Sequence, residues 1–203
     1  MTRFLQHISP RGFHWRVRTG EKVIYLTFDD GPTQELTTEI LKILGRYNAQ
    51  ATFFCVGQNV EELPEVYSRI ISRKHITGNH TYHHLNGWKT GKSAYLSDVS
   101  KCDALMGSPF FRPPYGKIKL SQANVLRKHY KIIMWDVLSR DFDRKMSKED
   151  CLHRTIHLTR PGSIVVFHDN IKAADNMLYC LPRYLEYFSK EGYRFEGLRE
   201  EVF

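Results

Sequence analysis

The 203-residue sequence contains no long hydrophobic run, and no stretch approaches the roughly 18 apolar residues that a transmembrane helix requires. Residues 1–20 also lack the apolar segment of about 7 to 15 residues that marks a secretory signal. The sequence therefore predicts neither a membrane span nor an export signal. We expect a cytoplasmic protein, or else the mature or trimmed form of an exported one.

Closely spaced cysteines and blocks of basic residues are absent as well. The four cysteines lie far apart without a CxxC pair, so nothing suggests a zinc finger or a disulfide scaffold. The net charge of +8 would favour anionic partners such as nucleic acid. Because the basic residues are scattered in ones and twos, without a nucleic-acid-binding motif, we expect no nucleic-acid partner. The sequence leaves the oligomeric state open.

Apolar segments rich in β-branched and aromatic residues alternate with segments of helical periodicity along the chain. This alternation predicts one α/β domain, over 21–203, with about six or seven parallel strands. The polar residues 1–20 are predicted to form an irregular N-terminal arm. The expected strands are 23–28, 51–56, 75–79, 110–111, 130–135, 163–167 and 193–195, and the expected helices are about 34–46, 60–73, 92–106, 119–129, 147–158 and 175–190.

Side chains able to bind a metal or move a proton follow five of the expected strands. The first group, Asp29-Asp30, needs a metal, an arginine or a shared proton, because adjacent carboxylates raise each other's pKa. Taken alone, this pair is equally compatible with a solvated turn. Since the carboxyl ends of parallel strands lie on one side, we expect the five groups to converge. They are Asp29-Asp30, Asn79 to His84, Arg112 to Gly116, the set Asp136, Ser139, Arg140, Asp141 and Asp143, and His168-Asp169.

These segments resemble, in order and spacing, the motifs of the polysaccharide deacetylase family, also called carbohydrate esterase family 4. The motifs are TFDDGP at 27–32, HTxxH at 80–84 and RxPY at 112–115, and the resemblance covers about 27–169. It implies a deformed (β/α) barrel of fewer than eight regular units. It also implies metal-dependent hydrolysis of an N-acetyl amide or O-acetyl ester on a sugar, with 21–203 as the catalytic domain.

Two imidazoles and one carboxylate make a three-ligand site that leaves a coordination position open. His80 and His84, four residues apart, can share one helical face, with Asp30 as the third ligand. His83 is a rival ligand, but the family pattern favours His84. Zinc suits this donor set, and cobalt, manganese or nickel accepts similar ligands.

The resemblance also implies roles for five further residues. Asp29 would act as the general base, and Arg112 would pair with it and keep it charged. The backbone N–H of Tyr115 would donate a hydrogen bond to the oxyanion. His168 would be the general acid that protonates the leaving sugar amine, and Asp141 would orient it and raise its pKa.

The sequence departs from the family pattern in its last two motifs. The DxxDW form of the fourth motif becomes Leu138 to Phe142, and Val166 stands where the fifth motif commonly has leucine. Substrate recognition is therefore less defined than the chemistry. We expect an acetylated glycan or oligosaccharide substrate that contains N-acetylglucosamine, as in peptidoglycan fragments or chitin-type oligosaccharides. The alternatives are an O-acetyl esterase acting on xylan-type glycans, and a carbohydrate-binding protein with a vestigial site.

Overall fold

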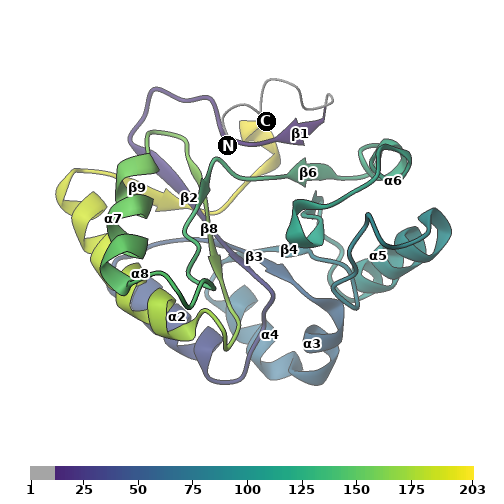
Figure 1. Cartoon of the computed structure of the whole chain (residues 1–203), viewed down its shortest axis with the longest axis horizontal. Coiled ribbons are helices and arrows are strands. Elements are labelled where there is room, and N and C mark those ends of the chain that lie inside the picture. Colours follow the sequence, from purple (N-terminus) through teal and green to yellow (C-terminus); the bar gives the residue numbers. More distant parts are fainter. Residues whose placement is uncertain (1–11) are drawn as a thin grey trace.

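The structure is a computed structural model that describes residues 12–203. These residues hold nine strands in one sheet, and every pairing between the strands is parallel (Figure 1). The sheet order is β1-β6-β5-β4-β3-β2-β8-β7, with β9 paired to the first half of β2. The strands are β1 Phe13–His14, β2 Val23–Asp29, β3 Thr52–Cys55, β4 Ile76–Asn79, β5 Phe110–Phe111, β6 Lys131–Ile133, β7 Val137–Leu138, β8 Ile164–His168 and β9 Arg194–Glu196.

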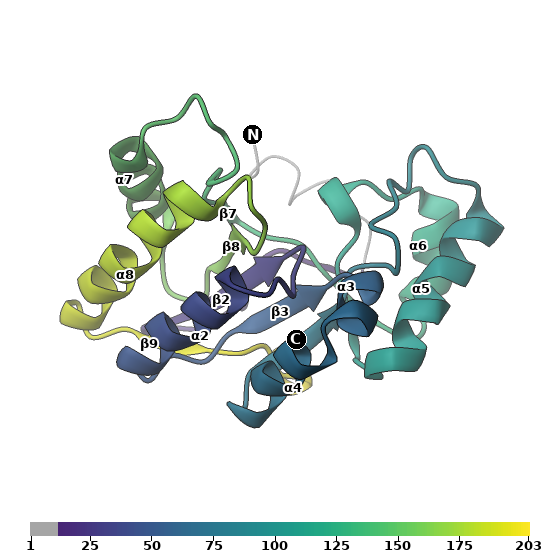
Figure 2. The ribbon, with the colours of Figure 1, turned by 90° about the horizontal axis from the view of Figure 1, so that it is seen from below.

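The sheet curls into an incomplete barrel, because no strand pairing within the described residues joins its edge strands β1 and β7. Figures 1 and 2 show the helices around the outside, with α2, α7 and α8 beside β2 and β8, and α5 and α6 beyond β4. The predicted deformed (β/α) barrel with a single domain is therefore confirmed. The helices are α2 Leu36–Arg46, α3 Gly57–Glu62, α4 Pro64–Ser72, α5 Lys92–Met106, α6 Leu120–Leu126, α7 Lys148–Leu158 and α8 Ala174–Lys190, with 3-10 turns η1 Pro114–Gly116 and η2 Glu200–Val202.

Strand β2 pairs with β3, β8 and β9, and all seven of its residues are buried. Leu26 and Phe28 face the core beneath α2 and α8, where Phe28 stacks on Phe53 and Phe167. Since successive side chains of a strand point to opposite faces, Thr27 and Asp29 point to the barrel interior instead. This alternation places the last carboxylate of β2 inside the barrel mouth.

The predicted helix over 60–73 is two helices. Helix α3 ends at Glu62, and Pro64 is the first residue of α4. Proline has no backbone N–H to continue a preceding helix and favours the first helical position. The chain therefore bends at Leu63, whose backbone is not helical.

The predicted strand over 130–135 is shorter than expected, and a further strand follows it. Strand β6 pairs with β1 and β5, whereas β7 pairs with β8. The chain thus passes from one side of the open sheet to the other between Met134, whose N–H donates to the His14 carbonyl, and Asp136, whose N–H donates to the Ile164 carbonyl. Strands β1 and β7 raise the strand count above the predicted six or seven. Each has only two residues, too few to show a periodicity in the sequence.

The predicted N-terminal arm is described only from Gly12 onward, and residues 1–11 lie outside the described residues. In the described part, Phe13–His14 pairs with β6 and extends the sheet. Among the helices of residues 12–203, none has both the length and the apolar character needed to cross a membrane. The four cysteines are buried free thiols.

Candidate active site

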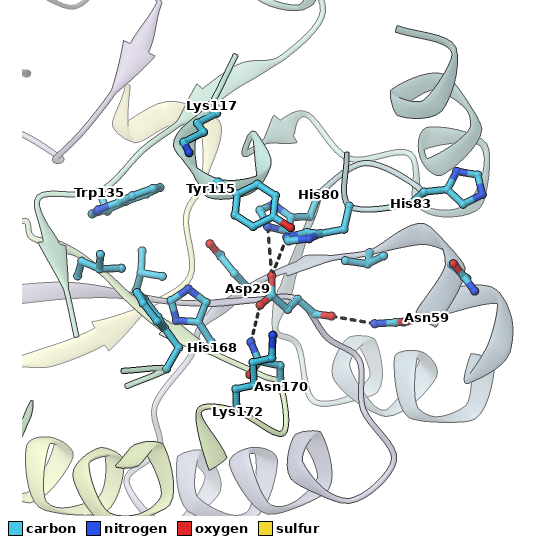
Figure 3. Close-up of a pocket in the computed structure, with 17 residues that line it drawn as sticks. Asp29, Asn59, His80, His83, Tyr115, Lys117, Trp135, His168, Asn170 and Lys172 are labelled. Atoms are coloured by element: carbon cyan, nitrogen blue, oxygen red, sulfur yellow. Dashed lines mark hydrogen bonds and ion pairs between the residues drawn. The ribbon is translucent and has the colours of Figure 1, made fainter. Parts of the chain in front are cut away.

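A cavity of about 750 Å³ opens at the carboxyl ends of the strands, where the sequence predicts the polar groups to converge (Figure 3). Residues at or beyond the ends of β2, β4, β5 and β8 line it. Six of the eight predicted site residues lie on its surface. These are Asp29, Asp30, His80, His84, Tyr115 and His168. The other two, Arg112 and Asp141, are fully buried behind it.

Asp30, His80 and His84 form a cluster whose donor atoms all lie within 4.8 Å of one another. The Asp30 Oδ1 atom is 3.0 Å from His84 Nε2 and 3.5 Å from His80 Nε2. The His80 Nδ1–H donates to the Arg112 carbonyl at 2.8 Å, which leaves the Nε2 lone pair directed at the cluster. Two imidazoles and a carboxylate are donors that suit a divalent transition metal. The tautomer of His80 also suits metal binding, because its Nε2 atom carries no proton.

The cluster does not use the helical face that the spacing of His80 and His84 allows. Residues 80–84 form a loop after β4, and Thr81 and His84 have positive φ angles of 63° and 54°. The Asp98 carboxylate holds this loop by accepting hydrogen bonds from the backbone N–H groups of residues 82 and 83. The imidazoles therefore converge because the loop turns back over the strand end.

His83, the rival ligand, has a different partner. Its Nδ1 lies 2.5 Å from the Asp98 Oδ1 atom, and its side chain is half exposed at the cavity wall. Figure 3 shows its ring directed away from the cluster. The structure thus brings His84, and not His83, to Asp30 and His80.

Two asparagines that the sequence analysis missed hold Asp30 in place. The Asn170 Nδ2 group donates to Asp30 Oδ2 at 2.5 Å, and its own Oδ1 accepts from the Ala173 N–H at 3.0 Å. The Asn59 Nδ2 group donates to the Asp30 carbonyl at 2.8 Å. Burial alone would raise the pKa of Asp30, but the adjacent imidazoles of His80 and His84 lower it well below its ordinary value. The only sequence signal that could have identified Asn170 as a site residue is its position directly after His168-Asp169.

The adjacent carboxylate of Asp29 has an entirely different environment. The Arg112 guanidinium donates to Asp29 Oδ1 at 2.6 Å, and the same nitrogen donates to Thr27 Oγ1 at 2.7 Å. The remaining Arg112 nitrogens donate to the carbonyls of Ile133 and Met134. This buried cation pairs with the Asp29 carboxylate and fixes its orientation. The two neighbouring acids thus have separate partners.

His168 contacts Asp141 twice. Its Nδ1 lies 2.7 Å from Asp141 Oδ1, and its backbone N–H donates to Asp141 Oδ2 at 2.7 Å. Burial favours the neutral ring, but the Asp141 charge and hydrogen bond outweigh it and raise the pKa of His168 to about 9. The Nε2 atom remains free to face the cavity as a protonated donor.

The strand register sets the spacing between Asp29 and His168. The two residues are direct partners in the β2–β8 pairing. Neighbouring strands lie about 4.8 Å apart, and paired side chains project on the same face. A carboxylate and an imidazolium therefore stand on the same side of the cavity, one strand apart.

A buried carboxylate supports the loop that carries Asp30. Asp169 accepts hydrogen bonds from the hydroxyls of Thr33 (2.8 Å) and Thr37 (2.5 Å). Burial raises the pKa of Asp169 to about 7 against these bonds. A Cβ at Gly31 would overlap this carboxylate, so only glycine fits there. The buried Asp169 carboxylate thus fixes the conformation of the turn after β2.

Tyr115 and three apolar residues complete the walls. Tyr115 has a φ of 61°, and its exposed ring lies 4.7 Å from the His84 ring, centroid to centroid. On the opposite wall, Phe142 packs edge-on against His168 at 4.9 Å. Leu138 and Val166 line the cavity beside it. The positions that depart from the family motifs therefore form one apolar wall.

Not every strand-end group reaches the cavity. Asp136 is buried away from it, where it accepts from the Ser163 hydroxyl and the Ile164 N–H and lies near Arg16 and Arg160. Arg140 and Asp143 pair with each other at 2.6 Å on the surface. Of the polar side chains in the predicted group after Trp135, only that of Asp141 bonds to a residue that lines the cavity.

The chain belongs to the polysaccharide deacetylase family, because the family model described as "Polysaccharide deacetylase" matches residues 16–131. This match includes the residues of the first three motifs and ends before Asp141 and His168. The strand-paired position of His168 beside Asp29 thus adds geometric evidence beyond the matched segment.

Relatives and solved structures agree with this assignment. A peptidoglycan-N-acetylglucosamine deacetylase of Bacillus cereus is 34% identical over 152 residues, which are 71% of this chain and 55% of that protein. The matched region therefore spans little more than half the length of that relative. A chitooligosaccharide deacetylase of Azorhizobium caulinodans is 33% identical over 170 residues, 80% of each chain. A peptidoglycan N-acetylglucosamine deacetylase, solved in complex with 4-naphthalen-1-yl-N-oxidanyl-benzamide, has a TM-score of 0.87 at 29% identity, covering 94% of this chain and 95% of that one.

Proposed function

We propose that this protein is a metal-dependent hydrolase that removes acetyl groups from N-acetylated sugars. One observation carries the proposal: the adjacent carboxylates Asp29 and Asp30 have different partners. Asp30 faces two imidazoles, as a metal ligand does, whereas Asp29 faces a buried arginine and remains available as a base. A vestigial sugar-binding site would not need this division of roles.

Asp30, His80 and His84 are the residues that would hold the metal, most suitably zinc. When bound, such an ion polarises the acetyl carbonyl and makes water acidic enough to act as a nucleophile near neutral pH. Asn170 and the Arg112 carbonyl would orient these ligands through their outer atoms, which sustains metal affinity.

The remaining residues would move protons and stabilise charge. Asp29 accepts the proton of the attacking water, and Arg112 keeps the carboxylate oriented for that task. The Tyr115 N–H donates to the carbonyl oxygen as negative charge develops on it. His168, held protonated by Asp141, gives its proton to the leaving sugar nitrogen. The apolar wall of Leu138, Phe142 and Val166 receives the acetyl methyl group.

The names of the relatives support N-acetylglucosamine-containing glycans as the substrate class, either peptidoglycan or chitooligosaccharides. An O-acetyl ester on a xylan-type glycan is the second candidate, because an ester presents the same carbonyl and methyl group. The His168 proton favours the amide, since a sugar amine is a poor leaving group unless it is protonated.

The pH profile tests the pairing of His168 with Asp141. Activity should fall as the pH rises through about 9, because His168 then loses its proton. An Asp141→Asn protein lacks the charge that raises this pKa, so its basic limb should move toward the ordinary value near 6.5 or below. The measurement is kcat/KM against pH for both proteins. Asp143→Asn, whose carboxylate pairs with Arg140, is the control, and an unshifted limb in Asp141→Asn would contradict the assignment.

The proposed function is tested by acetate release from N-acetylglucosamine oligomers. Metal-stripped protein should release no acetate, and added zinc or cobalt should restore release. His80→Ala should bind metal weakly and stay inactive after zinc is added. Acetylated xylan serves as the second substrate in parallel. Release from xylan alone would favour the esterase, whereas tight metal binding without release from either glycan would favour a vestigial site.

A further inference from the structure

The cavity wall continues onto an exposed aromatic residue that the proposed chemistry does not use. Lys117 lines the cavity beside Tyr115, and Figure 3 shows both at its upper rim. The Lys117 ammonium lies 5.3 Å from the ring centroid of Trp88. The Trp88 side chain is 60% exposed and follows the loop that carries His80 and His84. Trp88 and Lys117 therefore form a surface next to the cavity, called the Trp88 platform below.

This platform is held rigidly. The Trp88 Nε1–H donates to the Ile118 carbonyl at 3.2 Å, and the Gly87 N–H donates to the Lys117 carbonyl at 3.1 Å. The buried Gln122 amide donates to the Gly87 carbonyl at 3.0 Å. The two loops are so close that a Cβ at Gly87 would overlap the Lys117 carbonyl. An indole fixed in this way loses little conformational entropy when a ligand stacks on it.

The exposure of the Trp88 indole distinguishes a ligand-binding role from a purely structural one. A tryptophan that only joined two loops would gain most by burying its large apolar surface. Here the N–H is bonded to protein, while most of the side chain stays in water. Within residues 12–203 no carboxylate lies within ion-pair distance of the Lys117 ammonium, so its hydrogen atoms are available to a ligand.

We propose that the Trp88 platform binds the sugar residue next to the one being deacetylated. The apolar C–H face of that sugar stacks on the indole, and Lys117 donates hydrogen bonds to its hydroxyl or carboxylate oxygens. This inference rests on the proposed function, and it specifies an oligosaccharide substrate over a single sugar. A sugar ring has an apolar C–H face and polar hydroxyl groups, so it matches a surface that combines an aromatic ring with a cation.

Chain-length preference in kinetics is the first test. Wild-type protein should show a higher kcat/KM for the N-acetylglucosamine tetramer than for the monosaccharide. In Trp88→Ala the ratio of these two values should fall about tenfold, mainly through the KM for the tetramer. Trp88→Phe keeps a ring but loses the Nε1–H, so it should retain most of the preference. Ile71→Ala, which removes an exposed apolar residue of α4, is the control.

Binding without catalysis keeps the inference separate from the proposed function. Calorimetric titration of the tetramer into Asp29→Asn and into Asp29→Asn/Trp88→Ala measures affinity where turnover is blocked. About tenfold weaker binding in the double variant supports the platform even if acetate release fails. Equal affinities, no measurable binding in Asp29→Asn, or an unchanged chain-length ratio in Trp88→Ala would overturn it. Lys117→Ala should weaken binding in the same direction.

Discussion

An Asp29→Asn protein is expected to keep its fold and its metal affinity while losing about a thousandfold or more of its activity. A positioned general base contributes roughly 10² to 10⁴ in rate, and asparagine cannot accept the proton. The Arg112 side chain retains Thr27 and two backbone carbonyls as partners, so the substitution leaves the guanidinium bonded. The measurement is kcat/KM for acetate release, together with zinc affinity by calorimetry.

Asp175→Asn, on the exposed first turn of α8, is the matched control and should behave as wild type. Full activity in Asp29→Asn would show that another group accepts the proton. A loss of zinc affinity equal to the loss of activity would instead make Asp29 a ligand.

Replacing Arg112 with leucine is expected to destabilise the protein by about 3–5 kcal/mol, the usual effect of removing one partner of a buried ion pair. Arg112 is fully buried, and its guanidinium lies 4.0 Å from the Phe54 ring centroid while bonding to Asp29. Leucine is apolar and smaller, so it leaves the Asp29 carboxylate buried without a cation. Chemical denaturation of wild type and variant gives the difference in free energy of unfolding.

A second substitution separates the two contributions. The double variant Arg112→Leu/Asp29→Leu removes the unpaired carboxylate, so it should recover part of the lost stability. Arg112→Lys should recover little, because an ammonium cannot make the four directed bonds of the guanidinium. If the double variant were less stable than Arg112→Leu, the unpaired charge would not be the cause of the destabilisation.

Strand ends could be predicted from the sequence because the strands themselves are apolar and their last residues are not. Asp29 and His168 are the last residues of β2 and β8, and His80 directly follows β4, so the parallel strands carry all three to one side. The same reasoning misplaced Asp136. It also follows a strand, but the chain leaves β6 there for β7 at the opposite edge, and no local pattern shows that crossing.

The supporting residues were beyond sequence reasoning for a different reason. Asn59 and Asn170 act through single hydrogen bonds across long sequence separations, and their neighbours show no periodicity. The left-handed backbone of His84 and Tyr115 likewise depends on the loops around it. Tertiary contacts, and not local propensity, decide such positions.

The large sequence separation between β2 and β8 also determines when these two strands can pair during synthesis. Thr27 and Val165 are bonded although 138 residues separate them, and Asp29 and His168 complete the same ladder. A ribosome adds roughly 5–20 residues per second, so β2 waits several seconds for its partner. Until then its apolar edge is an unpaired template for aggregation. Pairing with β8 therefore covers this edge and brings the proposed base beside the proposed acid only after most of the chain has been synthesised.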